Sequence, residues 1–216
     1  MTKNIYAEAT GEIEEKKSRF IAHLMPVTCE EDAVAYINSM KKKYFDARHN
    51  CYAFVIGDNS ELTRCSDDGE PSGTAGRPIL EVLLGEGLTN VVCVVTRYFG
   101  GTLLGTGGLV RAYQASTKEG INNSVIIEKK PGITCTIVAD YTDVGKLQYS
   151  FNDEGVHTID SVYGADVTFE LVIDEDFYET RVKDFTEKTA GRAKIEKGDK
   201  VLYAEINGKI QIDPAK

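Results

Sequence analysis

Residues 90–113 read NVVCVVTRYFGGTLLGTGGLVRAY, and this stretch decides how the first part of the chain folds. The apolar run from Val91 to Val95 predicts a buried strand. A glycine-rich connection then leads to a helix that we expect to begin near Gly107 and to end near Glu119. Glycine loses more backbone entropy on folding than any other residue, so this density indicates a sharp bend or a close backbone approach. The glycines concerned are Gly100, Gly101, Gly105, Gly107 and Gly108.

A glycine loop that opens onto a helix N-terminus presents unpaired N–H groups and the positive end of the helix dipole, which suit an anion. Arg97 and Arg111 bracket this loop, so a phosphate-bearing ligand is expected there. The loop has neither the GK[ST] of a P-loop nor the last glycine of a dinucleotide-binding turn. A tight connection whose glycines only permit close packing is the alternative.

A second polar loop, residues 64–77, reads RCSDDGEPSGTAGR. Long polar loops of this kind are disproportionately functional. Its three carboxylates could hold Mg²⁺, and the ion could bridge a phosphate. The preferred interpretation is that they cap the backbone of their own loop through Asx turns. The candidate residues of this loop are Asp67, Asp68, Glu70, Ser72 and Thr74.

Aromatic residues beside a basic one are the combination that stacks on unpaired bases, and Tyr98 and Phe99 follow Arg97 directly. Aromatic residues at the end of a strand are more often lids of the core, and this alternative stays open. His49 could activate Cys65 as a nucleophile, but the dyad requires a hydrogen bond that a sequence cannot show. Neither a metal site nor a cofactor is predicted. The candidate contacts to an anion or a nucleic acid are the five glycines above with Arg48, Arg77, Arg97, Tyr98 and Arg111.

Composition describes an ordinary globular chain of 216 residues, of which 42% are hydrophobic and 27% charged. The first residues contain no apolar segment typical of a signal peptide, and no apolar run is long enough to span a membrane. Five scattered cysteines favour reduced thiols and a cytoplasmic location. The net charge of −9 disfavours indiscriminate binding to a phosphate backbone. Residues 1–130 hold 15 Lys/Arg and 17 Asp/Glu, a net charge of −2, whereas residues 131–216 hold 10 and 17, a net charge of −7.

The pattern of elements predicts an α+β fold in two domains. Residues 129–132, KKPG, are expected to be a linker that separates a domain of residues 1–130 from one of residues 131–216. In the second domain the predicted order is β-α-β-β-α-β, which is the ferredoxin-like plan. In the first, Thr28 is expected to cap a helix, with Glu31 completing a capping box. The other predicted elements there are strands at 4–14, 18–27, 51–56, 61–65 and 90–97, a further strand that begins at 124–128, and a helix that has Pro78 in its first turn and runs to about Leu84.

Three blocks of sequence resemble the signatures of the bacterial YigZ branch of the IMPACT family. They are DARHNCYAFVIG at 46–57, RCSDDGEPSGTAGRPIL at 64–80, and the whole of 90–113. The resemblance implies an N-terminal α/β domain of the superfold shared by elongation factor G domain IV and the GHMP small-molecule kinases. It also implies a ferredoxin-like C-terminal domain similar to elongation factor G domain V. The family's eukaryotic relatives are translational regulators that bind the activator of an initiation-factor kinase.

Three functions remain open at this point. The first is a cytosolic regulatory binding module of translation, whose partner would be the ribosome, a structured RNA or a translation factor. The second is an enzyme that acts on a phosphorylated or nucleotide small molecule with Mg²⁺, with no catalytic residue identified. The third is a protein–protein adaptor in which both polar loops are only turns.

Overall fold

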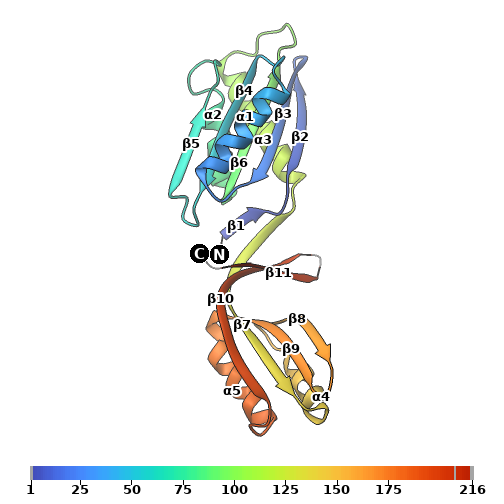
Figure 1. The fold of residues 1–216 in the computed structure, drawn as a ribbon. Helices are drawn as coiled ribbons and strands as arrows, with labels where there is room; N and C mark the ends of the chain where they lie inside the picture. The colour runs from blue at the N-terminus through green and yellow to red at the C-terminus, as the bar shows by residue number, and fades with distance from the viewer. Residues whose placement is uncertain (1, 207, 215–216) are drawn as a thin grey trace. The chain divides into compact units, whose positions relative to one another are not determined.

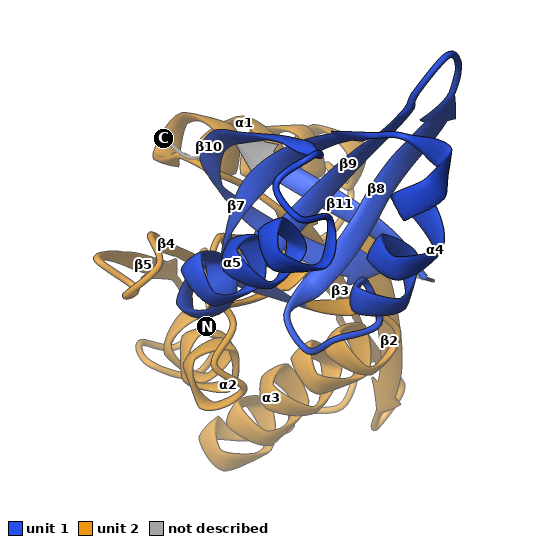
Figure 2. Cartoon of the chain, turned by 90° about the horizontal axis from the view of Figure 1, so that it is seen from below, with its two compact units in different colours: residues 1, 128–216 blue, residues 2–127 orange. Residues whose placement is uncertain are grey.

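The computed structural model describes residues 2–206 and 208–214 of the chain (Figure 1). They form two compact units, residues 2–127 and residues 128–216, which we call the N-terminal and C-terminal units (Figure 2). Each unit has its own sheet and its own hydrophobic core. The predicted α+β fold class is therefore confirmed.

The N-terminal unit is a five-stranded antiparallel sheet of order β2-β3-β6-β4-β5 with helices on both faces (Figure 1). One helix, α1, packs on one face, and α2 and α3 cover the other. The strands of this unit are β1 (Thr2–Ile5), β2 (Ala9–Glu15), β3 (Ser18–Pro26), β4 (His49–Ile56), β5 (Leu62–Ser66) and β6 (Val91–Tyr98), and its helices are α1 (Glu30–Lys43), α2 (Gly76–Gly85) and α3 (Thr106–Asn122).

The central strand β6 is apolar over most of its length because both of its faces are covered. Val91, Cys93 and Val95 belong to the core under α2 and α3, whereas Val92 and Val94 belong to the core under α1. Successive side chains of a strand point to opposite faces. Arg97 therefore points toward the α2 and α3 side, and Tyr98 points to the other side.

Two helix starts differ from the sequence prediction. The N-cap of α1 is Cys29, and it makes no side-chain capping bond. The Thr28 hydroxyl donates to Asp32 at 3.4 Å, so the predicted capping box with Glu31 is wrong. Helix α3 begins at Thr106, one residue before the predicted start, because Gly105 has φ +74°. This left-handed conformation favours glycine and changes the direction of the chain before the helix.

The C-terminal unit has the predicted ferredoxin-like arrangement. Its strands lie in the order β10-β7-β9-β8, all antiparallel, and β11 extends the sheet beside β10. Leu147 of α4 and Phe185 of α5 pack with Phe169 in one core. The elements are β7 (Ile126–Ala139), α4 (Tyr141–Ser150), β8 (Val156–Tyr163), β9 (Val167–Asp174), the 3-10 helix η1 (Glu175–Phe177), α5 (Tyr178–Lys188), β10 (Lys194–Ile206) and β11 (Lys209–Pro214).

The linker expected at residues 129–132 is wrong, since these residues lie inside the single long strand β7. Pro131 lies opposite Leu202 of β10, and pairing with β9 begins at Gly132. Proline and glycine next to each other predicted a break, but pairing with neighbouring strands outweighs this local preference.

Within the part of the chain that the structure describes, no helix is both long enough and apolar enough to cross a membrane.

The contact between α3 and β2 gives a first testable prediction. A Cβ added at Gly11 would lie 2.3 Å from the backbone nitrogen of Gly120. We expect Gly11→Ala to lower the free energy of unfolding of the N-terminal unit by about 1–3 kcal/mol, because the strand and the helix must move apart. Urea denaturation followed by circular dichroism measures the change.

The matched control is Gly85→Ala, at the end of α2, where an added Cβ meets nothing within 4 Å. We expect this variant to be as stable as the parent chain or slightly more stable. Equal stability of the Gly11→Ala variant and the parent would contradict the close packing of α3 on β2.

Candidate functional site

A pocket of about 410 Å³ lies in the N-terminal unit, at the end of the sheet where β4 begins and β6 ends. His49 and Arg97 are direct neighbours across these two strands and both line it. The sequence left open whether the two polar loops meet, and the structure brings both to this pocket. The lining residues are Arg48, His49, Gly69, Glu70, Pro71, Arg97, Phe99, Leu103, Leu104, Gly105, Thr106 and Leu109.

A buried ion pair joins the two loops. Arg97 is 6% exposed and Glu70 is 9% exposed, and Nη1 of Arg97 lies 2.5 Å from Oε1 of Glu70. The Tyr113 hydroxyl, from α3, donates to the same oxygen at 2.9 Å. The Arg97 guanidinium also packs against the rings of Phe20 and Phe99, at 5.4 and 5.6 Å from their centres. These contacts compensate much of the cost of burying a charge.

One polar atom of Arg97 is left without a partner. Among the residues that the structure describes, Nε of Arg97 is buried and makes no hydrogen bond. Leaving a buried donor unpaired costs about 1–3 kcal/mol. Arg97 therefore lines the pocket with a side chain whose buried Nε has no hydrogen-bond partner among the described residues.

The neighbouring thiol and phenol are not poised for nucleophilic chemistry. Cys51 donates to the carbonyl of Asp67 at 3.0 Å and contacts the Tyr113 hydroxyl at 3.3 Å. Burial raises the pKa of the Cys51 thiol and that of the Tyr113 hydroxyl, so both stay protonated near neutral pH. His49 and Cys65 do not form the dyad considered from the sequence. Nδ1 of His49 contacts the Asp68 carbonyl at 2.9 Å, and Cys65 lies opposite Ala53.

The first carboxylate of the acidic loop caps its own loop. Asp67 accepts hydrogen bonds from the backbone N–H groups of Gly73, Ala75 and Gly76, at 2.8 to 3.0 Å. Burial acts to raise the pKa of Asp67, but these three donors outweigh it and hold the pKa below its usual range. Thr74 follows the same local pattern, because its hydroxyl donates to the carbonyl of Pro71. This is the Asx-turn interpretation preferred from the sequence.

The other two carboxylates have partners of their own. Asp68 accepts from the N–H of Asn50 at 2.7 Å and pairs with Lys41 at 2.5 Å, whereas Glu70 pairs with Arg97. The three acidic residues thus do not converge on one ion. Among the described residues, no group of three His, Cys, Asp or Glu side chains is placed to hold a metal. This arrangement gives no support to an enzyme that uses Mg²⁺ bound by this loop.

The N-terminus of α3 opens on the pocket. The first intrahelical bond runs from the N–H of Leu109 to the carbonyl of Gly105, which leaves the N–H groups of Thr106, Gly107 and Gly108 as the unpaired first turn. Gly105, the N-cap, has no side chain to cap them. Gly105 and Thr106 are exposed and line the pocket. The helix end is therefore uncapped and accessible, as an anion site requires.

The glycines that precede α3 have different roles. A Cβ at Gly100 would lie 2.0 Å from the backbone of Lys17, and its N–H donates to Ser18, so Gly100 permits close packing. Gly101 has φ +85° in an exposed position. The packing interpretation therefore suits Gly100, and the open backbone expected for an anion begins at Gly105.

The arginines of the N-terminal unit divide into two groups. Four have an acidic partner: Arg19, Arg64, Arg77 and Arg97 pair with Glu12, Glu30, Glu81 and Glu70. Among the described residues of this unit, Arg48 and Arg111 have none. Arg48 is exposed and lines the pocket, and Nη1 of Arg111 would lie 3.7 Å from a Cβ at Gly107. The two unpaired arginines thus flank the uncapped helix end.

Of the fifteen sequence candidates, all of them described residues, Arg48, Glu70, Arg97 and Gly105 line the pocket and the other eleven do not. Arg77, Tyr98 and Ser72 are three of these eleven. Arg77 is on the first turn of α2 and pairs with Glu81. Tyr98 points to the opposite face from Arg97, and its hydroxyl donates to Asp46 at 2.9 Å. Ser72 is exposed in the polar loop and does not line the pocket.

Phe99, which the sequence suggested with Tyr98 as a stacking residue, lines the pocket and lies under the Arg97 guanidinium. Other pocket residues were not among the sequence candidates. Leu103, Leu104 and Leu109 form an apolar wall of the pocket. Only the folded connection brings them there, so spacing along the chain gives no signal for them.

Comparison with known proteins shows which class of two-domain α+β proteins this chain belongs to. Residues 16–121 match the Impact N-terminal domain, and residues 137–192 match a domain of unknown function, DUF1949. A solved structure described as the crystal structure of an hypothetical protein has a TM-score of 0.59 and 33% identity, and the match covers 90% of this chain and 95% of that chain.

Two bacterial relatives match nearly the whole length. The IMPACT family member YvyE of Bacillus subtilis (strain 168) is 42% identical over 194 residues, which cover 90% of this chain and 89% of the relative. The IMPACT family member YigZ of Escherichia coli (strain K12) is 37% identical over 177 residues, which cover 81% and 85%. The chain belongs to the IMPACT family and is of the YigZ type, as the resemblance of its signature blocks suggested.

The buried ion pair gives the second prediction. We expect Arg97→Met to lower the free energy of unfolding by about 3–5 kcal/mol, because Glu70 would be left buried and charged without its cation. Adding Glu70→Gln should restore much of this stability. Urea denaturation of both single variants and the double variant measures the interaction energy. Additive effects of the two substitutions would contradict a direct buried pair.

Asp67 gives a prediction on pH dependence. Its pKa is lower in the folded chain than in the unfolded one, so its stabilising contribution is complete above about pH 4. The contribution disappears as pH falls through the folded-state pKa. We expect Asp67→Asn to be less stable than the parent at pH 7, with the difference shrinking below about pH 4. A deficit of Asp67→Asn that stays constant at every pH would contradict the mechanism.

Proposed function

We propose that this chain is a cytosolic regulatory binding module of translation, and that its N-terminal unit contacts RNA of the ribosome or another structured RNA at the pocket rim. Membership of the IMPACT family supports the link with translation, since the family's eukaryotic relatives are translational regulators. The contact itself is inferred from the geometry of the site.

The observation that carries the proposal is a pair of arginines that have no acidic partner among the described residues. Arg48 and Arg111 flank the uncapped N-terminus of α3, while the other arginines of the unit are each neutralised by a glutamate. Arginine and helix N-termini are both common donors to phosphate oxygens. The free positive charge of these arginines thus lies where backbone N–H groups can also bind a phosphate.

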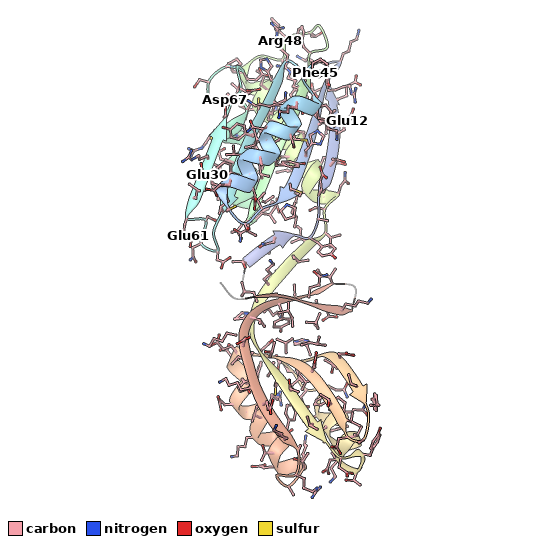
Figure 3. The ribbon with its side chains drawn as sticks, in the orientation of Figure 1. Glu12, Glu30, Phe45, Arg48, Glu61 and Asp67 are labelled. Atoms are coloured by element: carbon pink, nitrogen blue, oxygen red, sulfur yellow. The ribbon has the colours of Figure 1, made fainter. Side chains whose placement is uncertain are left out.

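Exposed aromatic side chains near these arginines favour unpaired bases over a duplex. Phe45 is 84% exposed, and Figure 3 shows it at the same end of the N-terminal unit as Arg48. Phe99 is 41% exposed and lines the pocket. Exposed aromatic rings beside arginines stack on the bases of loops and single strands. A looped region of a structured RNA satisfies both the phosphate and the stacking contacts.

The charge distribution favours the N-terminal unit for this contact. Residues 131–216 carry a net charge of −7, which repels a phosphate backbone, whereas residues 1–130 carry −2. A nearly neutral unit with one local positive site is expected to bind RNA selectively, and this binding should weaken as the salt concentration rises.

The test is cosedimentation with ribosomes, together with binding to a structured RNA, over a range of salt concentrations. Replacing Arg48 and Arg111 by alanine should weaken binding. The plot of log K against log salt has a negative slope, and its magnitude should fall by about 0.7–0.9 for each phosphate that is no longer neutralised. The matched control is Arg64→Ala with Arg77→Ala, which removes the same charge from two exposed arginines that are paired with glutamates. This control should bind nearly as well as the parent.

Equal weakening by both double variants would reduce the contact to general electrostatics. Binding that is insensitive to salt and to all four substitutions would sink the proposal. Capture of a protein factor, with no binding to ribosomes or RNA, would replace the RNA partner by a protein.

A further inference from the structure

We propose that the pocket itself binds a phosphate monoester carried on a flat organic group, with the size of a nucleoside monophosphate. The inference rests on the proposed function in one respect, because both use Arg48 and Arg111 as contacts for phosphate. It goes beyond that function in assigning a small, enclosed ligand to the pocket.

The charge around the pocket suits a dianion. Glu70 neutralises Arg97, and Lys41 neutralises Asp68. Arg48 lines the pocket, and Arg111 lies beside it on α3, with its Nη1 3.7 Å from a Cβ built at Gly107. The α3 N-terminus adds about half an elementary charge. A phosphate monoester carries about −1.5 to −2 at pH 7, whereas a phosphodiester carries about −1. The positive charge left at the pocket therefore matches a monoester better.

The Arg97 side chain gives a second observation that points to a ligand, and this observation does not depend on the helix end. Its side chain is 7% exposed, lines the pocket, and carries a buried Nε with no hydrogen-bond partner among the described residues. The N–H groups of Thr106, Gly107 and Gly108 are likewise unpaired within the helix. A phosphate at the end of α3 would receive hydrogen bonds from the first turn and lie next to the Arg97 side chain.

The other wall of the pocket suits an organic group. Leu103 and Phe99 line the pocket and are 82% and 41% exposed, and Leu104, Leu109 and Pro71 complete the apolar wall. Large apolar side chains that remain this exposed gain from covering an apolar ligand face. A volume of about 410 Å³ lies within the range of small-molecule sites. Inorganic phosphate would leave this wall unused.

Two sources share this chemistry, a free mononucleotide and the 5′-terminal nucleotide of an RNA. The probes are therefore AMP, adenosine, inorganic phosphate, and one short oligoribonucleotide with either a 5′-phosphate or a 5′-hydroxyl. Isothermal titration of the full chain measures each affinity. We expect AMP to bind at least about tenfold more tightly than adenosine or inorganic phosphate, because only AMP reaches both walls.

The variant that isolates the pocket is Thr106→Pro. Thr106 is the first residue of α3, and Gly105 before it has ψ 167°, so proline fits there and removes one N–H donor without breaking the helix. We expect AMP to bind about tenfold more weakly, with Arg48 and Arg111 intact. The matched control is Tyr141→Pro, which makes the same change at the first residue of α4 and should leave AMP affinity unchanged.

Each outcome decides between the two proposals. AMP binding without ribosome binding would overturn the proposed function and leave the pocket assignment standing. Ribosome binding without AMP binding would overturn the pocket assignment and leave the proposed function standing. A 5′-phosphate oligonucleotide that binds like AMP, with its 5′-hydroxyl form weaker, identifies an RNA end as the source. No binding of AMP or of the 5′-phosphate oligonucleotide at millimolar concentration, or equally weakened AMP binding in Thr106→Pro and Tyr141→Pro, would overturn the inference.

Discussion

The pocket of the N-terminal unit depends on the ion pair between Arg97 and Glu70, which lies almost completely out of water. Arg97 comes from the central strand, Glu70 from the polar loop, and the Tyr113 hydroxyl from α3 reaches the same carboxylate oxygen. One acidic oxygen therefore fixes three separate parts of the chain. Because an unpaired buried charge is costly, each part is held where it must be for the others to stay paired.

Because Glu70 neutralises Arg97 inside the unit, the positive charge that remains near the pocket belongs to more exposed arginines. The deepest arginine of the pocket organises the loops, and two outer arginines keep their charge. The uncapped end of α3 lines the same pocket as Arg48 and the buried pair, and Arg111 lies near Gly107 of its first turn. The arrangement separates structure from recognition, since side chains that hold the pocket together differ from those available to a ligand.

Much of the fold could be predicted from local patterns. The apolar run of β6, the proline at the first turn of α2 and the β-α-β-β-α-β order each follow from rules that act over a few residues. The site was predicted less completely. Strand alternation sends Tyr98 away from Arg97, and tertiary pairing keeps residues 129–132 inside β7. The sequence does not show that Arg48 and Arg111 lack an acidic partner among the described residues, because an ion pair depends on which acidic residue folding brings near. The Arg77–Glu81 pair, by contrast, follows from its i,i+4 spacing on a helix.

The strand order of the N-terminal sheet bears on how this chain folds as it leaves the ribosome. Strands β3 and β4 are both made before β6, yet they do not pair with each other, because β6 lies between them. Until residue 98 has emerged, both strands carry backbone edges that lack their final neighbour, and such edges are prone to pair with other chains. The centre of the sheet is thus its last strand to be synthesised, and β3 and β4 gain their shared neighbour only when it is complete.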